Sequence, residues 1–174
     1  MDEETKRDTK IAIGQHRYAV QRAMRAIIDP LIQRANEHDL SKFEPDELEG
    51  FARIRGVACE HPYGSDEYRA ALKAEKPTIE RHYARNSHHP EHWDRPDHNI
   101  GPGMMGLLDV IEMVCDWWGA WKCYEAERAP EHRSTWQQNM DRQRGRFLKD
   151  GRYLSYEQWW AVEQVVALLE AIDL

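Results

Sequence analysis

One stretch near the middle of the chain, from Met104 to Trp121, limits the possible fold most strongly. Placed at about 100° per residue, its apolar side chains surround the axis almost completely, which predicts a central helix in an all-α domain. The stretch also carries three carboxylates within about 60° of arc: Asp109, Glu112 and Asp116. Carboxylates that face a core require compensation, either by Arg or Lys or by a metal ion, and both interpretations stay open here.

Helical spacing continues through the rest of the chain, and no run alternates with period two. We expect a charged tail over residues 1–8 and one all-α domain over residues 9–174, a helical bundle with a central metal site. The first helix is predicted from Thr9 to Ile28, with a kink or restart at Pro30. Further helices are predicted to begin near these positions: Pro45, Ser65, Thr78, Met104, Ser134 and Ser155.

Composition excludes several classes of protein. A formal net charge of −7 without a basic run disfavours duplex nucleic acid as a ligand. The acidic residues of the central stretch disfavour a membrane span, and the charged start "MDEETKRDTK" is unlike a signal peptide. Three cysteines without a CxxC pair point to a reducing compartment, so we expect a cytoplasmic protein.

Histidines are concentrated in one region of the sequence. Five fall within seventeen residues: His82, His88, His89, His92 and His98. A solvated polar loop is the simpler interpretation of "HHPEHW", but His82, Asn86 and His89 recur at helical spacing on one side of a segment that ends at Pro90. The pattern therefore also allows a ligand set.

Two earlier histidines lie on predicted inward faces. His16 shares a stripe with the apolar residues of the first helix, where a hydrogen-bonded core histidine is the alternative. His38 follows Leu31 and Ala35 inward and precedes Asp39, whose alternative role is that of an exposed helix cap. Imidazoles and carboxylates from several helices would form a mixed nitrogen and oxygen site for Mn, Fe, Co or Zn.

The order of these motifs resembles the HD-domain superfamily of metal-dependent phosphohydrolases, which are all-α. "HDLSK", from His38 to Lys42, is similar to that superfamily's HD-x-G-K variant, with Ser41 in place of the glycine. "HHPEHWD" and "VCDWWGA" are similar to the paired histidines and the late Asp of its dinuclear members. Over nearly its full length the chain also resembles a phage-associated family of small HD-like proteins, which would place it in a host cytoplasm.

The resemblance implies one or two divalent ions. His16, His38, Asp39 and Asp116 would hold one metal, and His82, His88 and His89 would contribute to a second, with Asp39 as the bridge. Asp109 and Glu112 are second choices for the late ligand. The G-Y-P element of cyclic-dinucleotide hydrolysis is lacking, so that substrate is not implied.

The implied activity is hydrolysis of a phosphate ester, most simply a nucleotide, by a metal-activated water. Lys42 would neutralise phosphate charge, although a solvated helix-end lysine is the alternative. Proximity alone nominates four residues for the substrate-binding wall: Arg81, Arg85, His92 and Trp93. A di-iron oxygenase, or a non-catalytic accessory protein that binds a nucleotide or a host protein, would fit the same ligands. The oligomeric state stays open.

Overall fold

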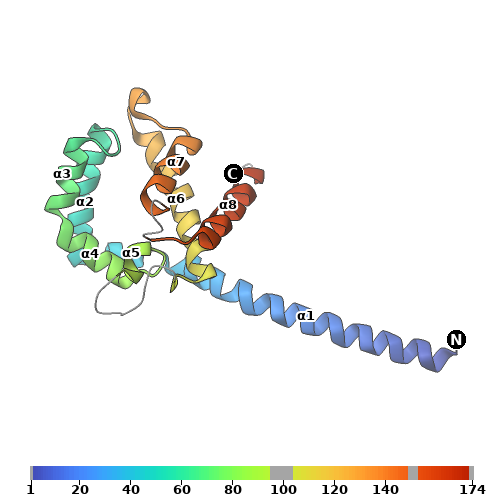
Figure 1. Cartoon of the computed structure of the whole chain (residues 1–174). Helices are drawn as coiled ribbons and strands as arrows, with labels where there is room; N and C mark the ends of the chain where they lie inside the picture. Colours follow the sequence, from blue (N-terminus) through green and yellow to red (C-terminus); the bar gives the residue numbers. More distant parts are fainter. Residues whose placement is uncertain (1, 95–103, 149–152, 173–174) are drawn as a thin grey trace. The chain divides into compact units, whose positions relative to one another are not determined.

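The computed structural model describes residues 2–94, 104–148 and 153–172. These ranges contain helices and no β-strand, which confirms the all-α prediction. The chain separates into two compact units, Met1–His38 and Asp39–Leu174. Figure 1 shows the helices of both units with their labels.

The first unit is one continuous helix, α1 (Glu3–Glu37). Asp2 caps its start, because the Asp2 carboxylate accepts a 2.7 Å hydrogen bond from the backbone N–H of Thr5. Residues Glu3 to Asp8, which were expected to form a charged tail, are therefore helical. The expected restart at Pro30 is absent: a proline removes only one backbone hydrogen bond, and α1 continues through it.

The second unit contains the other helices found in the described ranges. In chain order they are η1 (Leu40–Phe43), α2 (Pro45–Glu60), α3 (Asp66–Ala74), α4 (Lys76–Arg85), α5 (Pro90–Trp93), α6 (Leu107–Glu127), η3 (Pro130–His132), α7 (Trp136–Phe147) and α8 (Tyr156–Ala171). The starts predicted at Pro45, Ser65 and Ser155 are confirmed, and Ser65 and Ser155 each accept a backbone N–H as the cap. Helix α4 begins two residues before the predicted Thr78.

The core of the second unit is built around α6, as the apolar stretch predicted. Met113, Val114 and Trp117 of α6 are buried, and the Trp117 ring stacks on Phe147 of α7 with centroids 5.5 Å apart. Helix α6 also packs against α8. Burial of each such side chain contributes about 1.5–3 kcal/mol. No helix in the described ranges combines the length and the apolar character needed to cross a bilayer.

Helices α2, α3 and α4 pack on one another, as Figure 1 shows. Helix α2 approaches α4 closely at Gly50, where an added Cβ atom would lie less than 3.0 Å from the side chain of Thr78. Only glycine allows this approach. The contact fixes α4 one turn before His82, the first histidine of the cluster.

Candidate metal centre

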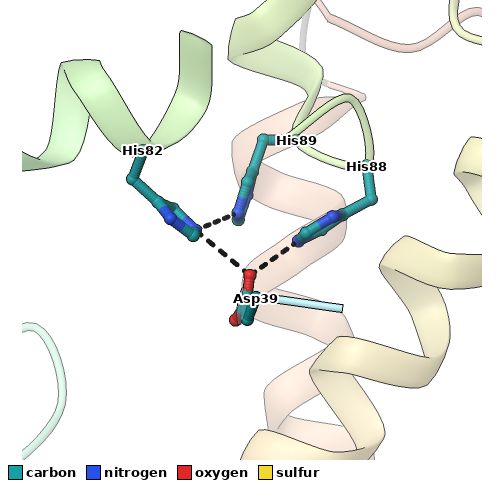
Figure 2. Close-up of side chains that lie close together, drawn as sticks. All are labelled: Asp39, His82, His88 and His89. Atoms are coloured by element: carbon teal, nitrogen blue, oxygen red, sulfur yellow. Dashed lines mark hydrogen bonds and ion pairs between the residues drawn. The ribbon is translucent and has the colours of Figure 1, made fainter. Parts of the chain in front are cut away.

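Four side chains of the second unit converge on one point: Asp39, His82, His88 and His89. Figure 2 shows the carboxylate and the three imidazoles directed toward one another. Each offers a ligand atom, and these four atoms all lie within 4.8 Å of one another. The cluster therefore joins Asp39, the second residue of the HD pair, to the later histidine segment, from which it is separated by more than forty residues of sequence.

Local structure explains how each ligand is directed. Asp39 has φ 56°, in the left-handed region, and its carbonyl accepts a 2.9 Å hydrogen bond from Lys42 N–H that starts η1. His82 lies in the last turn of α4, and Asn86 ends that helix. The chain then turns through His88 to His89, which precedes Pro90 at the first position of α5.

The spacing of the ligand atoms suits a metal ion. The Nε2 atoms of His82 and His89 are 2.9 Å apart. Asp39 Oδ1 lies 3.3 Å from Nε2 of His82 and 3.5 Å from Nε2 of His88. Ligands that each stand about 2.1 Å from one metal are separated from one another by roughly 3 to 3.5 Å. The residues present fit a divalent cation with nitrogen and oxygen ligands.

A buried carboxylate that the sequence prediction missed orients His82. Glu47 has no exposed surface, and its Oε2 lies 3.0 Å from His82 Nδ1. Arg85 donates to the other oxygen of Glu47 at 2.8 Å, and Ser41 Oγ donates to Oε2 at 2.8 Å. An ionised Glu47 can only accept, so it favours the proton on Nδ1 and leaves the Nε2 lone pair for a metal.

Glu112 has the same relationship to His88. Its Oε1 lies 3.1 Å from His88 Nδ1, and the His88 imidazole is 2% exposed. A carboxylate behind the non-ligating nitrogen is the usual outer partner of a metal-binding histidine. Glu112, a second choice as a direct ligand, therefore contacts the Nδ1 atom of a candidate ligand, His88. Two of the three imidazoles, those of His82 and His88, thus have a carboxylate at Nδ1 and present Nε2 to the cluster.

The environment of His89 favours the neutral imidazole. Burial, and then the neighbouring His88 and His82, hold the pKa of His89 well below its ordinary value of 6.5, against the opposing influence of Asp39. A neutral imidazole is the form that binds metals. His89 is thus available as a ligand at neutral pH.

Lys42 is bound to the cluster and is not a solvated helix-end residue. Its ammonium group donates to Asp39 Oδ2 at 2.5 Å and lies 5.0 Å from the centre of the Phe51 ring. Burial opposes the charge of Lys42, but the carboxylates of Asp39 and Asp116 outweigh it and raise the pKa of Lys42. Lys42 is therefore a permanent cation beside the cluster.

The two candidates for the late ligand have different environments. Asp109 accepts from Ser87 Oγ at 2.6 Å and from the backbone N–H of Gly106 at 3.1 Å, so it caps α6 and ties α6 to the turn before His88. A carboxylate oxygen of Asp116 lies within 4.8 Å of one of Asp39. This geometry favours Asp116 over Asp109.

The ligand set expected for the first metal needs a correction. His16 and His38 belong to the same straight unit, because α1 runs without interruption from Glu3 to Glu37 and His38 caps its end. Their separation of twenty-two sequence positions corresponds to about 33 Å at 1.5 Å per residue. One ion cannot bind both side chains of one chain. Of these two histidines, only His38 is adjacent to Asp39 in the sequence.

The four predicted wall residues have structural partners. Arg81 and Arg85 form ion pairs with Asp46 at the start of α2, with distances of 3.4 and 2.9 Å. His92 Nδ1 faces the carbonyl of Tyr83 at 2.8 Å, and Trp93 donates to the carbonyl of Ser87 at 2.8 Å. These contacts hold the histidine segment in position. His98 lies outside the described residues.

Glu47 could have been found in the sequence. It shares the inward face of α2 with Gly50 and Ile54, at helical spacing, and all three are buried. A carboxylate on such a face is costly unless it is paired, as are the carboxylates of α6. The missing information was its partner, because His82 is thirty-five residues away along the chain.

Comparison with known proteins gives a family and no activity. A family model described as "Family of unknown function (DUF5662)" matches residues 5–166, so the chain belongs to this family. Neither the curated proteins nor the solved structures gave a match.

Proposed function

We propose that this member of the DUF5662 family is a divalent-metal-dependent hydrolase that acts on a phosphate ester, with a nucleotide as the simplest substrate. The observation that carries the proposal is the convergence of Asp39 with the Nε2 atoms of three histidines, two of which have a carboxylate behind Nδ1. The ligand chemistry suits Mn, Fe, Co or Zn. The resemblance of "HDLSK" to a phosphohydrolase motif supports the choice of reaction.

Each side chain has a separate role in the proposed reaction. Asp39 and the histidines His82, His88 and His89 hold the ion, with Asp116 as a further oxygen ligand. Glu47 and Glu112 fix the histidine tautomers. A bound divalent cation supplies an acidified water and polarises a phosphoryl oxygen. Lys42 presents a positive charge beside Asp39, where a phosphate oxygen gains a charge-assisted hydrogen bond.

The test begins with metal analysis of the purified full chain. Mass spectrometry of its metal content, and titration with Mn²⁺, Fe²⁺, Co²⁺ and Zn²⁺, should give at least one tightly bound ion per chain. A panel of nucleoside mono-, di- and triphosphates with each metal should then give metal-dependent phosphate release. The matched control is His61→Ala, which removes an imidazole at the end of α2 outside the cluster.

Each alternative corresponds to a different result. A chain that binds no metal, and in which His82 and His89 merely share a proton, contradicts the proposal. Turnover that depends on oxygen indicates a di-iron oxygenase. Tight metal binding without release of phosphate from any substrate indicates a non-catalytic metal protein.

A further inference from the structure

His89 is held differently from the other two histidines of the cluster. A carboxylate contacts Nδ1 of His82 and of His88, but among the residues that the structure describes no carboxylate forms an ion pair at Nδ1 of His89. The His89 ring instead contacts the ring of Tyr83, with centroids 4.8 Å apart. A metal-binding histidine without an outer carboxylate needs other contacts to fix its ring.

The backbone on both sides of His89 is tied together by His92. The backbone N–H of His92 donates to the carbonyl of His89 at 3.0 Å. Its Nδ1 donates to the carbonyl of Tyr83, in the last turns of α4, at 2.8 Å. The position of His89 therefore depends on how α4 and α5, the helices that flank it in the sequence, are held together.

One guanidinium group from α7 joins these two helices. Nη2 of Arg146 donates to Glu91 Oε1 of α5 at 2.5 Å and lies 3.4 Å from the hydroxyl of Tyr83 in α4. The Glu91 side chain is 17% exposed, so its charge requires a partner inside the protein. Charge-assisted hydrogen bonds of this kind are stronger and shorter than neutral ones. Arg146 thus fixes α5 and the ring that covers His89 with a single group.

We propose that Arg146 positions His89 for metal binding. Arg146 acts through Glu91 and Tyr83, so it is a positioning residue and not a ligand. Its contacts take the place of the outer carboxylate that His89 lacks. This inference rests on the metal centre proposed above and is independent of the reaction that the metal supports.

The test is titration of the metal-free full chain with Co²⁺, which suits nitrogen and oxygen ligands. Arg146→Gln should weaken Co²⁺ binding by about tenfold or more, as loss of an outer partner does, and Arg146→Lys should weaken it less, because the charge stays. The visible absorption of bound Co²⁺ in Arg146→Gln should shift toward that of His89→Ala, an effect that a purely structural contact would not produce. Arg144→Gln, an exposed position of the same helix, is the matched control.

A double-mutant cycle tests the route through Glu91. Once Glu91 is changed to Gln, Arg146→Gln should cause little further loss of Co²⁺ affinity, because the ion pair is already absent. Additive losses would overturn the inference. Parent-like affinity and absorption in Arg146→Gln, or equal losses in Arg146→Gln and Arg144→Gln, would overturn it as well.

A second readout does not depend on a metal. The backbone N–H of His89 donates to the carbonyl of Asn86 at 3.3 Å, so its hydrogen exchange reports how firmly this turn is held. In the metal-free chain Arg146→Gln should exchange this N–H faster than Arg144→Gln does, and equal rates would contradict the positioning role. A parent chain that binds no metal would refute the proposed function, and the exchange rates would still decide whether Arg146 holds His89.

Discussion

Asp39 divides its two carboxylate oxygens between a cation and the histidines: Oδ2 accepts from Lys42 at 2.5 Å, while Oδ1 faces the Nε2 atoms of His82 and His88. The left-handed backbone at Asp39 makes this division possible, because it turns the chain sharply at the start of η1. Among the described residues no other non-glycine residue has a positive φ. Asp and Asn tolerate this conformation better than most residues.

Asp39→Asn should strongly weaken metal binding with little change in stability. Asparagine keeps the size of the side chain and its tolerance of a positive φ, but it lacks the charge that a hard divalent cation needs. We expect metal affinity to fall by roughly a hundredfold or more. Calorimetric metal titration and a melting curve of the metal-free chain measure the two quantities. Parent-like metal affinity would remove Asp39 from the ligand set.

Lys42→Gln should lower turnover more than metal content. The three imidazoles and Asp39 Oδ1 remain in place, so metal stoichiometry should be kept. Loss of about 1.4 kcal/mol of transition-state stabilisation would lower kcat/KM roughly tenfold. Because Lys42 is half-buried in an ion pair, the melting temperature should also fall, by an amount that corresponds to about 1 kcal/mol or less. Steady-state kinetics at saturating metal should reveal the effect, and an unchanged kcat/KM would exclude Lys42 from the reaction.

Glu47→Gln should weaken metal binding without removal of any ligand. The amide donates as well as accepts, so it no longer holds His82 in one tautomer, and the Arg85 charge loses its buried partner. A loss of about 10- to 100-fold in metal affinity is expected. Glu49→Gln, at an exposed position of the same helix, is the matched control. Equal affinities in the two variants would show that Glu47 serves only the fold.

Gly50→Ala should destabilise the protein by about 1–3 kcal/mol, because the added methyl group overlaps the side chain of Thr78 where α2 meets α4. Gly56→Ala in the same helix has open space around the new Cβ atom, so it should be neutral or stabilise by up to about 1 kcal/mol. Urea unfolding measures both. If the two variants unfold alike, the close approach of α2 and α4 does not exist in solution.

The stability of the metal-free chain should fall as pH drops below 6.5. The folded pKa of His89 lies well below 6.5, so between the two pKa values the unfolded chain binds a proton that the folded chain does not. At pH values above 6.5 His89 makes its full contribution to the free energy of unfolding, and this contribution decreases as the pH falls toward the folded pKa. His89→Gln should remove part of this slope, and His61→Gln should not. Urea unfolding at about pH 7.5 and about pH 5.5 gives the comparison; parallel slopes in all three proteins would contradict it.

Much of the helical framework was already determined by local sequence. Ser65 and Ser155 mark helix starts because their hydroxyl groups satisfy backbone N–H groups within three residues, and α6 is central because it is apolar nearly all round. These properties depend on neighbours along the chain. The concentration of His82, His88 and His89 was recognisable for the same reason, but the expected single helix up to Pro90 was wrong, because α4 ends at Arg85 and α5 begins at Pro90.

Tertiary structure decided which of the polar residues act together. Sequence placed Asp109, Glu112 and Asp116 on one stripe, but only packing shows that Asp109 caps a helix and that Glu112 stands behind His88. The pairing of Glu47 with His82 depends on the close approach of α2 and α4 at Gly50. His16 is the opposite case: the sequence analysis grouped it with His38 in one ligand set, but the uninterrupted α1 keeps the two side chains apart. Helical periodicity gives the direction of a side chain, whereas its partner depends on how helices distant in sequence pack.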